Sequence, residues 1–181
     1  MRFVLERCTV RPWRPDDAES LVRHANNRKV WLGLRDLFPH PYTIQDAHEF
    51  LQRTINEQPT MKFCIQIEGA AVGGIGVHPG QDVHRHTATV GYWLGEEFWG
   101  RGIMTEAVTV VTDFCFENFP LRRISAESLR TIQHPHARLK KPGSHSKDAS
   151  RMTSSKMGSF SIPYSTAGQR SVVRAEDLRV C

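Results

Sequence analysis

Apolar residues recur at intervals of three and four positions in two long segments of the chain. The first segment follows Thr43, which together with Asp46 resembles the capping box that begins many helices, and the second runs from Gly102 to Asn118. This spacing brings the apolar side chains to one face of a helix. We therefore predict two amphipathic helices here. The proline and acidic residues at positions 15–19 predict the first turn of an earlier helix.

Strand-type composition, with β-branched and aromatic residues or alternating apolar and polar positions, marks several further segments. They are residues 8–13, 63–67, 71–77, 86–94 and 121–126. Gly91 lies inside the fourth of these strands and indicates a bulge or a close approach of the backbone. Residues 27–42 have no sustained period, so we expect a loop or a broken helix there. The resulting order, β-α-α-β-β-β-α-β, predicts a mixed α/β layer fold.

The composition indicates a globular chain with one domain. Its 181 residues suffice for one sizeable core, and 39% hydrophobic and 24% charged residues are ordinary proportions. The four cysteines show no C-x-x-C spacing and no apolar leader follows Met1, so we expect reduced thiols and a cytoplasmic location. No apolar stretch approaches the roughly 20 residues that a membrane helix needs, so we expect no membrane span.

Charge and serine content divide the chain near Glu127. Residues 1–127 carry 14 Lys and Arg against 16 Asp and Glu, whereas residues 128–181 carry 10 against 3. The first part contains two serines and the second part ten. The net charge of +5 therefore originates in the second part. We predict one domain at residues 1–127 and a basic, serine-rich tail at residues 128–181, whose composition favours disorder.

Gly100 and Gly102, separated by one residue, lie between a predicted strand and a predicted helix. Glycines at such a junction let the backbone turn so that free N–H groups and the positive end of the helix dipole point at one concave site. That arrangement binds an anion, and phosphate is the anion we expect. A tight turn without a ligand explains this spacing equally well, so the two glycines alone do not distinguish an anion site from a simple turn.

Three motifs surround these glycines: Gly-Tyr-Trp-Leu-Gly at 91–95, Phe-Trp-Gly-Arg-Gly at 98–102 and Thr-Glu-Ala at 105–107. Together they resemble the acetyl-CoA motif of the GNAT superfamily of N-acetyltransferases, especially its ribosomal-protein (Rim-like) branch. The resemblance covers residues 7–127. It implies a GNAT-like mixed α/β sheet and an enzyme that uses acetyl-CoA as its cosubstrate.

The resemblance also implies how acetyl-CoA is held. In the family, the pyrophosphate rests on the loop that corresponds to residues 99–104, and the pantetheine arm pairs like an extra strand with the segment at 92–94. The implied cofactor-binding residues are Tyr92, Trp93, Leu94, Trp99, Gly100, Arg101, Gly102, Ile103 and Met104.

The implied reaction is direct attack of an amine on the thioester, without a covalent enzyme intermediate. Backbone N–H groups would polarise the carbonyl group, and a carboxylate or a water molecule would remove the amine proton. Glu96, Glu97 and Glu106 are the candidate bases near the loop. Acidic residues at the start of a helix also complement the helix dipole without any catalytic role, and this alternative stays open for all three.

By the same resemblance, the amine acceptor should meet the first helices, the loop at 31–41 and the strand pair near 73–77. A protein N-terminal amine, an amino sugar, an antibiotic or a polyamine all remain open, because a fold does not fix its substrate. The nine histidines show neither H-x-x-x-H nor H-E-x-x-H spacing, so we predict no metal site.

Residues 128–181 lack the helix with an Asn-x-x-Ser start and a Lys-x-Gly-Phe end, and the final hairpin, that the family has at this point. Without them, the strand at 121–126 should present an unpaired edge. Back-translation of residues 140–148, read two bases later, can give Lys-Ala-Gly-Phe-Thr-Leu-Glu-Gly. In the same frame, residues 153–158 can give Val-Phe-Lys-Asp-Gly, a strand end with a hairpin turn. We therefore hypothesise a slip of the reading frame near residues 128–135, which would impair activity.

Two other function classes compete with an active acetyltransferase. One is a non-catalytic remnant that binds CoA, and the other is an interaction protein with a basic tail. The lysines and arginines of the tail are spread thinly and are not interleaved with aromatic residues. We therefore do not expect nucleic-acid binding.

Overall fold

The structure, a computed structural model, describes residues 1–35, 37–128 and 158–163. Its strands are β1 (Phe3–Val4), β2 (Thr9–Pro12), β3 (Lys62–Ile67), β4 (Ala70–Pro79), β5 (Thr87–Leu94), β6 (Arg123–Ser128) and β7 (Gly158–Pro163). Its helices are α1 (Ala18–Ala25), α2 (Arg28–Trp31), α3 (Ile44–Ile55) and α4 (Ile103–Asn118). Short 3₁₀ turns are η1 (Pro15–Asp17), η2 (Asp82–His84) and η3 (Glu96–Phe98).

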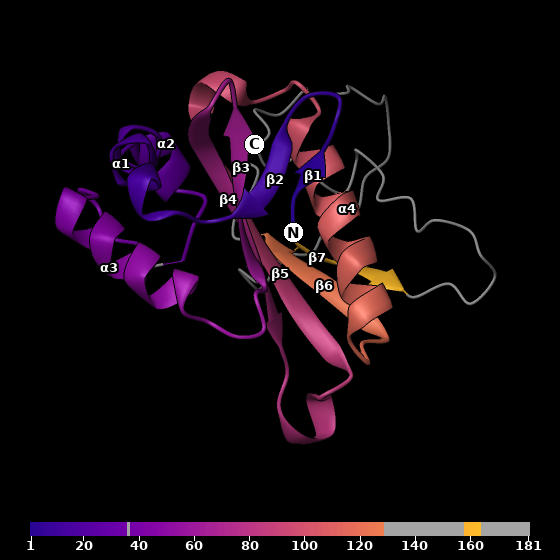
Figure 1. Cartoon of the computed structure of the whole chain (residues 1–181). Helices are drawn as coiled ribbons and strands as arrows, with labels where there is room; N and C mark the ends of the chain where they lie inside the picture. Colours follow the sequence, from indigo (N-terminus) through magenta and orange to yellow (C-terminus); the bar gives the residue numbers. More distant parts are fainter. Residues whose placement is uncertain (36, 129–157, 164–181) are drawn as a thin grey trace, which may run out of the picture.

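The described strands form one sheet in which neighbours in sequence are neighbours in space, from β1 to β7. All pairs are antiparallel except β5 with β6, which are parallel because α4 connects them as a crossover. The helices α1, α2 and α3 lie on one side of the sheet and α4 lies on the other (Figure 1). The predicted mixed α/β layer fold is therefore confirmed.

β5 pairs with β6 over only the first half of its length. Their pairing runs from Thr87 with Arg123 to Val90 with Ala126, and β5 then continues to Leu94. β6 continues instead in its pairing with β7. The sheet therefore divides after Val90, and the last part of β5 borders this division.

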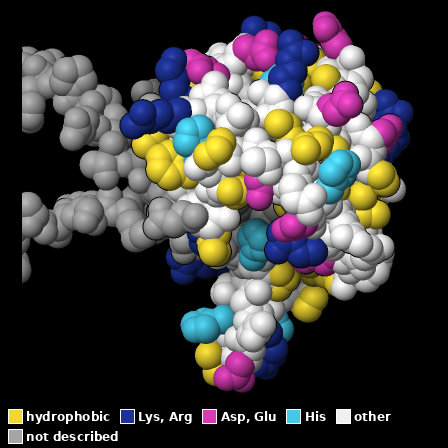
Figure 2. Space-filling model, turned by 90° about the vertical axis from the view of Figure 1, so that its left-hand side faces the viewer, with side chains coloured by type: hydrophobic (Ala, Val, Ile, Leu, Met, Phe, Trp, Pro, Cys, Tyr) yellow, Lys and Arg dark blue, Asp and Glu magenta, His cyan; other side chains and the backbone are white. Residues whose placement is uncertain are grey.

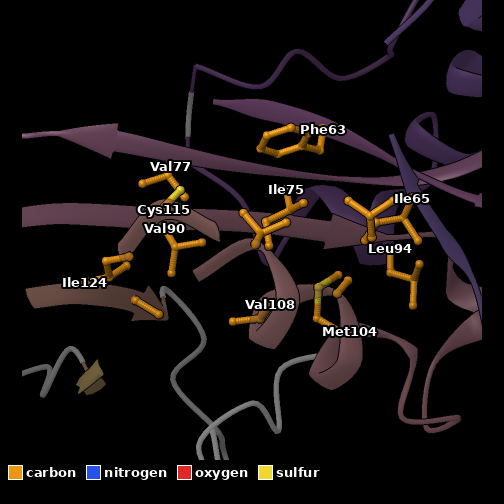
Figure 3. Packing of buried hydrophobic residues seen from close by; sticks show 14 of the residues in the cluster. Phe63, Ile65, Ile75, Val77, Val90, Leu94, Met104, Val108, Cys115 and Ile124 are labelled. Atoms are coloured by element: carbon orange, nitrogen blue, oxygen red, sulfur yellow. The ribbon is translucent and has the colours of Figure 1, made fainter. Parts of the chain in front are cut away.

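Apolar side chains fill both sides of the sheet. On the α4 side, Met104 and Val108 of the helix face Val90 and Leu94 of β5 (Figure 3). A second cluster, which includes Leu21 of α1 and Leu51 of α3, joins these helices to the opposite face. Complete burial of one large aliphatic side chain contributes about 1.5–3 kcal/mol, so these two clusters account for much of the stability that holds β5 and α4 in place.

A buried ion pair connects β2 to the start of α1. The Arg11 guanidinium donates from Nη1 to Asp17 Oδ2 at 2.8 Å and from Nη2 to Asp17 Oδ1 at 2.6 Å. The backbone N–H of Arg14 donates to the same carboxylate. The two side chains are only 3% and 6% exposed, so the pair is well shielded from solvent. It fixes the direction in which the chain leaves the sheet for α1.

The predicted helices before the sheet core are confirmed. Thr43 and Asp46 form both halves of the capping box at the start of α3. For residues 27–42 the sequence predicts a loop or a broken helix, and among the described residues of this segment the structure has the single turn of α2, which Asn27 caps through its side-chain oxygen. Sequence reasoning did not predict β1, because two residues are too few to show an alternating pattern.

Both interpretations of Gly91 are wrong. Gly91 pairs in register with Gly76, and the irregularity of the sheet lies between Ile65 and Gln66 of β3. A Cβ atom at Gly91 would meet nothing within 4 Å, so no backbone approaches it closely either. The glycine faces open space instead.

β7 corrects one prediction for the tail. Its backbone pairs with β6 from Arg123 with Pro163 to Ser128 with Gly158, so the prediction of an unpaired edge at 121–126 is wrong. The other predictions, disorder and a shifted frame, concern residues 128–181. Of these, 129–157 and 164–181 lie outside the described residues, whereas Ser128 ends β6 and 158–163 form β7. Within the described residues, no helix follows α4.

Candidate active site

Two glycines in the left-handed conformation shape the turn between β5 and α4. Gly100 has φ of 73° and Gly102 has φ of 74°, and a Cβ atom at Gly100 would meet nothing within 4 Å. α4 begins at Ile103, and no side chain caps its first turn. Because the first N–H groups of a helix lack partners within the helix, they are left for a ligand. The turn has the geometry of an anion-binding site.

The side chains next to this turn are held against the protein. The Trp99 indole donates from Nε1 to the backbone oxygen of Leu94 at 2.7 Å. The Arg101 guanidinium lies over the Phe98 ring, 5.5 Å from its centroid. Met104 is buried in the core below the turn. The glycine backbone is therefore left as the exposed surface of the loop, with the Arg101 cation beside it.

The last residues of β5 place their side chains in the two cores. Trp93 belongs to the cluster on the α1 and α3 side, whereas Leu94 belongs to the cluster on the α4 side. Tyr92 is half-buried against the α4-side cluster. Because these side chains pack into the two clusters, the backbone of residues 92–94 is what borders the point after Val90 where β5 and β6 separate.

Two of the predicted carboxylates, Glu96 and Glu97, are held by residues of the α1–α2 region. Glu96 accepts from Asn27 Nδ2 at 2.9 Å and from the Lys29 ammonium group. The hydrogen bonds from Lys29 and then Asn27 hold the pKa of Glu96 below its ordinary value. Glu97 lies 3.2 Å from Nδ1 of the buried His24. These contacts join η3 to the ends of α1 and α2.

Burial lowers the pKa of His24, with a smaller lowering from Arg23 and an opposing effect from Glu97. The imidazole also meets the Phe98 ring edge to face, with centroids 5.6 Å apart. A Cβ atom at Gly95 would lie 3.1 Å from its Nδ1. His24 is thus packed tightly against the segment that leads into the turn at Gly100 and Gly102.

Glu106, the third predicted carboxylate, is held by Arg7, which lies between β1 and β2. It accepts from the backbone N–H of Arg7 at 3.2 Å and from the Arg7 guanidinium. Its side chain is 22% exposed. The structure does not bring Glu106 together with Glu96 and Glu97 through any shared partner among the described residues.

A pocket of about 620 Å³ lies on the side of the sheet that carries α1 to α3. Its walls come from the loop before α3, from α3 itself and from β4 and β5, which includes the segments predicted to meet the amine acceptor. Figure 2 shows this face, where histidine and charged side chains lie beside a hollow near its middle. The volume is within the range of small-molecule sites.

The floor of this pocket includes two glycines. Gly76 of β4 and Gly91 of β5 form a cross-strand pair, and both line the pocket. A Cβ atom at Gly76 would lie 3.3 Å from Nε2 of His78 and 3.3 Å from Cγ of Lys62, so these two side chains cover Gly76, whereas a Cβ atom at Gly91 would meet nothing within 4 Å. Burial, followed by Lys62 and Arg35, lowers the pKa of His78. Sequence analysis did not single out His78, because no spacing or motif marks a lone histidine at the end of a strand.

Among the described residues, no group of three His, Cys, Asp or Glu side chains is placed to hold a metal ion. Within the same residues, no helix combines the length and hydrophobicity that crossing a membrane requires.

The sequence matches the family described as Acetyltransferase (GNAT) domain over residues 7–131. It is similar to YdaF of Bacillus subtilis (strain 168), which is provisionally named a ribosomal N-acetyltransferase. The two are 28% identical over 127 residues, which covers 67% of this chain and 69% of YdaF.

Solved structures of acetyltransferases have the same fold. Ribosomal-protein-S5-alanine acetyltransferase from Vibrio fischeri superposes with a TM-score of 0.60 at 22% identity, over 74% of this chain and 76% of that protein. RimL, a ribosomal L7/L12 alpha-N-protein acetyltransferase in complex with coenzyme A, superposes with a TM-score of 0.61 at 18% identity. The superposition covers 72% of this chain and 75% of RimL. At these identities the likeness establishes the fold.

Proposed function

Because this chain belongs to the GNAT acetyltransferase family, we propose that it transfers an acetyl group from acetyl-CoA to a primary amine, either a protein N-terminus or a small molecule. The observation that carries the proposal is the turn at Gly100 and Gly102. It presents the uncapped start of α4 close to the point where β5 and β6 divide. A molecule with a pyrophosphate and an extended amide-containing arm fits these two features together.

The residues that would hold acetyl-CoA are those the sequence predicted. The pyrophosphate oxygens would accept from the backbone of Trp99 to Met104, with Arg101 beside them. The pantetheine amides would pair with the backbone of Tyr92 to Leu94, as an added strand does at a free strand edge. The hydrogen bond from Trp99 to Leu94 supports this proposal, because it joins the two segments.

When bound, acetyl-CoA supplies an activated acetyl thioester. The amine nitrogen bonds to the carbonyl carbon, the carbon–sulfur bond breaks, one amine proton leaves and the CoA thiolate takes up a proton. Backbone N–H groups of the chain stabilise the negative charge on the carbonyl oxygen. Among the described cysteines, burial raises the pKa of Cys8 to about 11 and those of Cys64 and Cys115 to about 12. Such thiols are poor nucleophiles, which supports direct transfer.

Glu96, Glu97 and Glu106 stay candidates for the group that receives the amine proton. Glu97 is the most exposed of the three, at 62%, whereas Glu96 and Glu106 are each engaged by a cation. A carboxylate bound to a cation accepts a proton less readily. This comparison favours Glu97 among the three.

Calorimetry with acetyl-CoA tests the proposal, together with release of the free CoA thiol in the presence of amines. We expect saturable binding that Gly102→Asp abolishes, because a carboxylate and a strained backbone are placed where a phosphate should sit. Gly69→Asp is the control, since Gly69 also has a positive φ but lies in the β3–β4 turn, where a Cβ atom would meet nothing within 4 Å; at Gly102 it would meet only the Arg7 side chain, at 3.8 Å. Equal binding by parent and Gly102→Asp would refute the loop assignment.

The alternative functions give other results in the same experiment. A non-catalytic remnant would bind acetyl-CoA but release no thiol with any amine. An interaction protein with a basic tail would show neither. The shifted reading frame, which we keep as a proposal for residues 128–181, favours the remnant for the chain as it stands.

A further inference from the structure

The pocket on the α1 to α3 side is walled by aromatic rings that support one another. Trp13 and Phe50 meet edge to face with centroids 5.3 Å apart. Phe38 stacks on Tyr42 at 4.9 Å and leans on Trp93 at 6.1 Å. These five residues line the pocket. Because the rings are already packed, the walls are preformed for a flat hydrophobic group.

The floor of the pocket also suits a flat hydrophobic group. Gly91 presents no side chain, and a Cβ atom there would meet nothing within 4 Å, while its cross-strand partner Gly76 is covered by His78 and Lys62. The sheet divides directly after Val90, so this part of the floor lies where β5 begins to border the proposed pantetheine site. An amine that reaches the floor therefore approaches the proposed thioester position.

The charges around the pocket disfavour a second ammonium group. Its described lining contains the cations Arg35, Arg53 and Lys62 against the two carboxylates of Asp46 and Glu49. Both carboxylates already accept hydrogen bonds, Asp46 from Thr43 and Glu49 from Gln45. Lys62 is paired with Glu57. After burial, the positive charges of Lys62 and then Arg35 lower the pKa of His78, and Glu57 opposes them with a smaller effect.

We propose that this pocket takes a primary monoamine whose amino group is carried on a hydrophobic ring, and that it rejects polyamines. The ring lies between the aromatic walls, and the amino group points to the Gly76–Gly91 floor beside His78. Acetylation of this amine rests on the proposed function, but its binding does not.

The test is a titration of the full chain with 2-phenylethylamine, followed by tryptophan emission, since Trp13 and Trp93 line the pocket. Spermidine, glucosamine and a short peptide with an N-terminal alanine are titrated in parallel. We expect saturation with 2-phenylethylamine and binding at least about tenfold weaker with the other three. Equal or tighter binding of spermidine, glucosamine or the peptide would overturn the inference, and so would no binding of 2-phenylethylamine.

Gly91→Val tests the location. The side chain has room and suits a strand, but it fills the floor, so affinity should fall about tenfold or more while the urea midpoint is kept. Gly91→Ala should give a smaller loss and is decisive if the valine variant does not fold. Val83→Ala, at an exposed site outside the pocket, is the control. Unchanged affinity in both glycine variants would place the amine elsewhere and overturn the inference.

An acetyl-CoA titration of the same preparation separates the two proposals. Acetyl-CoA binding without amine binding would refute the pocket inference and leave the proposed function standing. Amine binding without acetyl-CoA binding would support the pocket and refute the function.

Discussion

The Trp99 indole N–H donates a hydrogen bond of 2.7 Å to the backbone oxygen of Leu94. This bond ties the turn that begins α4 to the last residue of β5, which are the two segments proposed to hold acetyl-CoA. It also occupies a carbonyl group at the end of the strand. The Trp99 side chain therefore helps to fix the position of the turn relative to the strand edge.

We predict that Trp99→Phe weakens acetyl-CoA binding, because the ring stays in place while the tie to Leu94 is lost. Loss of a neutral hydrogen bond costs about 0.5–1.5 kcal/mol, so the urea midpoint should fall only slightly. Trp31→Phe is the matched control, since the Trp31 indole donates to the backbone oxygen of Phe38, away from the turn. Calorimetry compares the two variants, and equal acetyl-CoA affinity would remove this role from Trp99.

The buried ion pair predicts a larger effect on stability than any exposed one. Arg11→Met leaves Asp17 buried without its partner and should lower the free energy of unfolding by about 3–5 kcal/mol. Arg7→Met breaks the contact with Glu106 on a side chain that is 44% exposed, where solvent screens the pair, so about 0–1 kcal/mol is expected. Urea unfolding measures both variants. Equal losses would show that the burial of Arg11 does not set its contribution.

His24 and His78 predict that acid destabilises the fold. Burial lowers the pKa of both below 6.5, so the unfolded chain binds protons more readily than the folded one. Stability is therefore full above about pH 6.5 and falls as the pH decreases from there towards the lowered folded pKa values. His24→Gln should flatten this slope in urea midpoints measured from pH 7.5 downwards. His48→Gln, on the exposed face of α3, should leave it unchanged.

The candidate carboxylates can be separated by steady-state kinetics. Loss of a general base lowers kcat by about 10²–10⁴-fold and removes the acidic limb of the pH profile. We expect this of Glu97→Gln. We expect Glu96→Gln to act mainly on the KM for acetyl-CoA, because Glu96 ties η3 to Asn27 and Lys29. A fall in kcat confined to Glu96→Gln or Glu106→Gln would reverse the assignment.

Local signals in the sequence predicted the elements that border the site. The spacing of Gly100 and Gly102 predicted a turn, and both glycines adopt the left-handed conformation that only glycine enters without strain. The Thr43 and Asp46 pair predicted the start of α3 for an equally local reason, two hydrogen bonds across three residues.

Features that depend on strand register could not be predicted in the same way. Gly91 lies opposite Gly76 only because β4 and β5 pair with that register, and the two residues are 15 positions apart in sequence. No local pattern marks such a pair. The same holds for β7, which joins β6 across 29 residues that the structure does not describe.

The last prediction concerns residues 128–181. If the reading frame slipped, restoring the shifted frame after Glu127 should raise acetyl transfer, because the family's missing helix and hairpin supply groups near the thiol that protonate the departing CoA. The gain in stability should be small. Leu121 and Ile124 are already 6% and 0% exposed, and β7 already pairs with the edge of β6.

The experiment expresses this chain and the frame-restored chain side by side and compares urea midpoints and release of the CoA thiol against a panel of amines. Acetyl-CoA affinity should be similar in the two, since the turn at Gly100 and Gly102 precedes the altered segment in both. Higher turnover with similar affinity would assign the defect to the chemical step. Equal turnover would show that residues 128–181 serve as a working end of the enzyme and would refute the slipped frame as a cause of impaired activity.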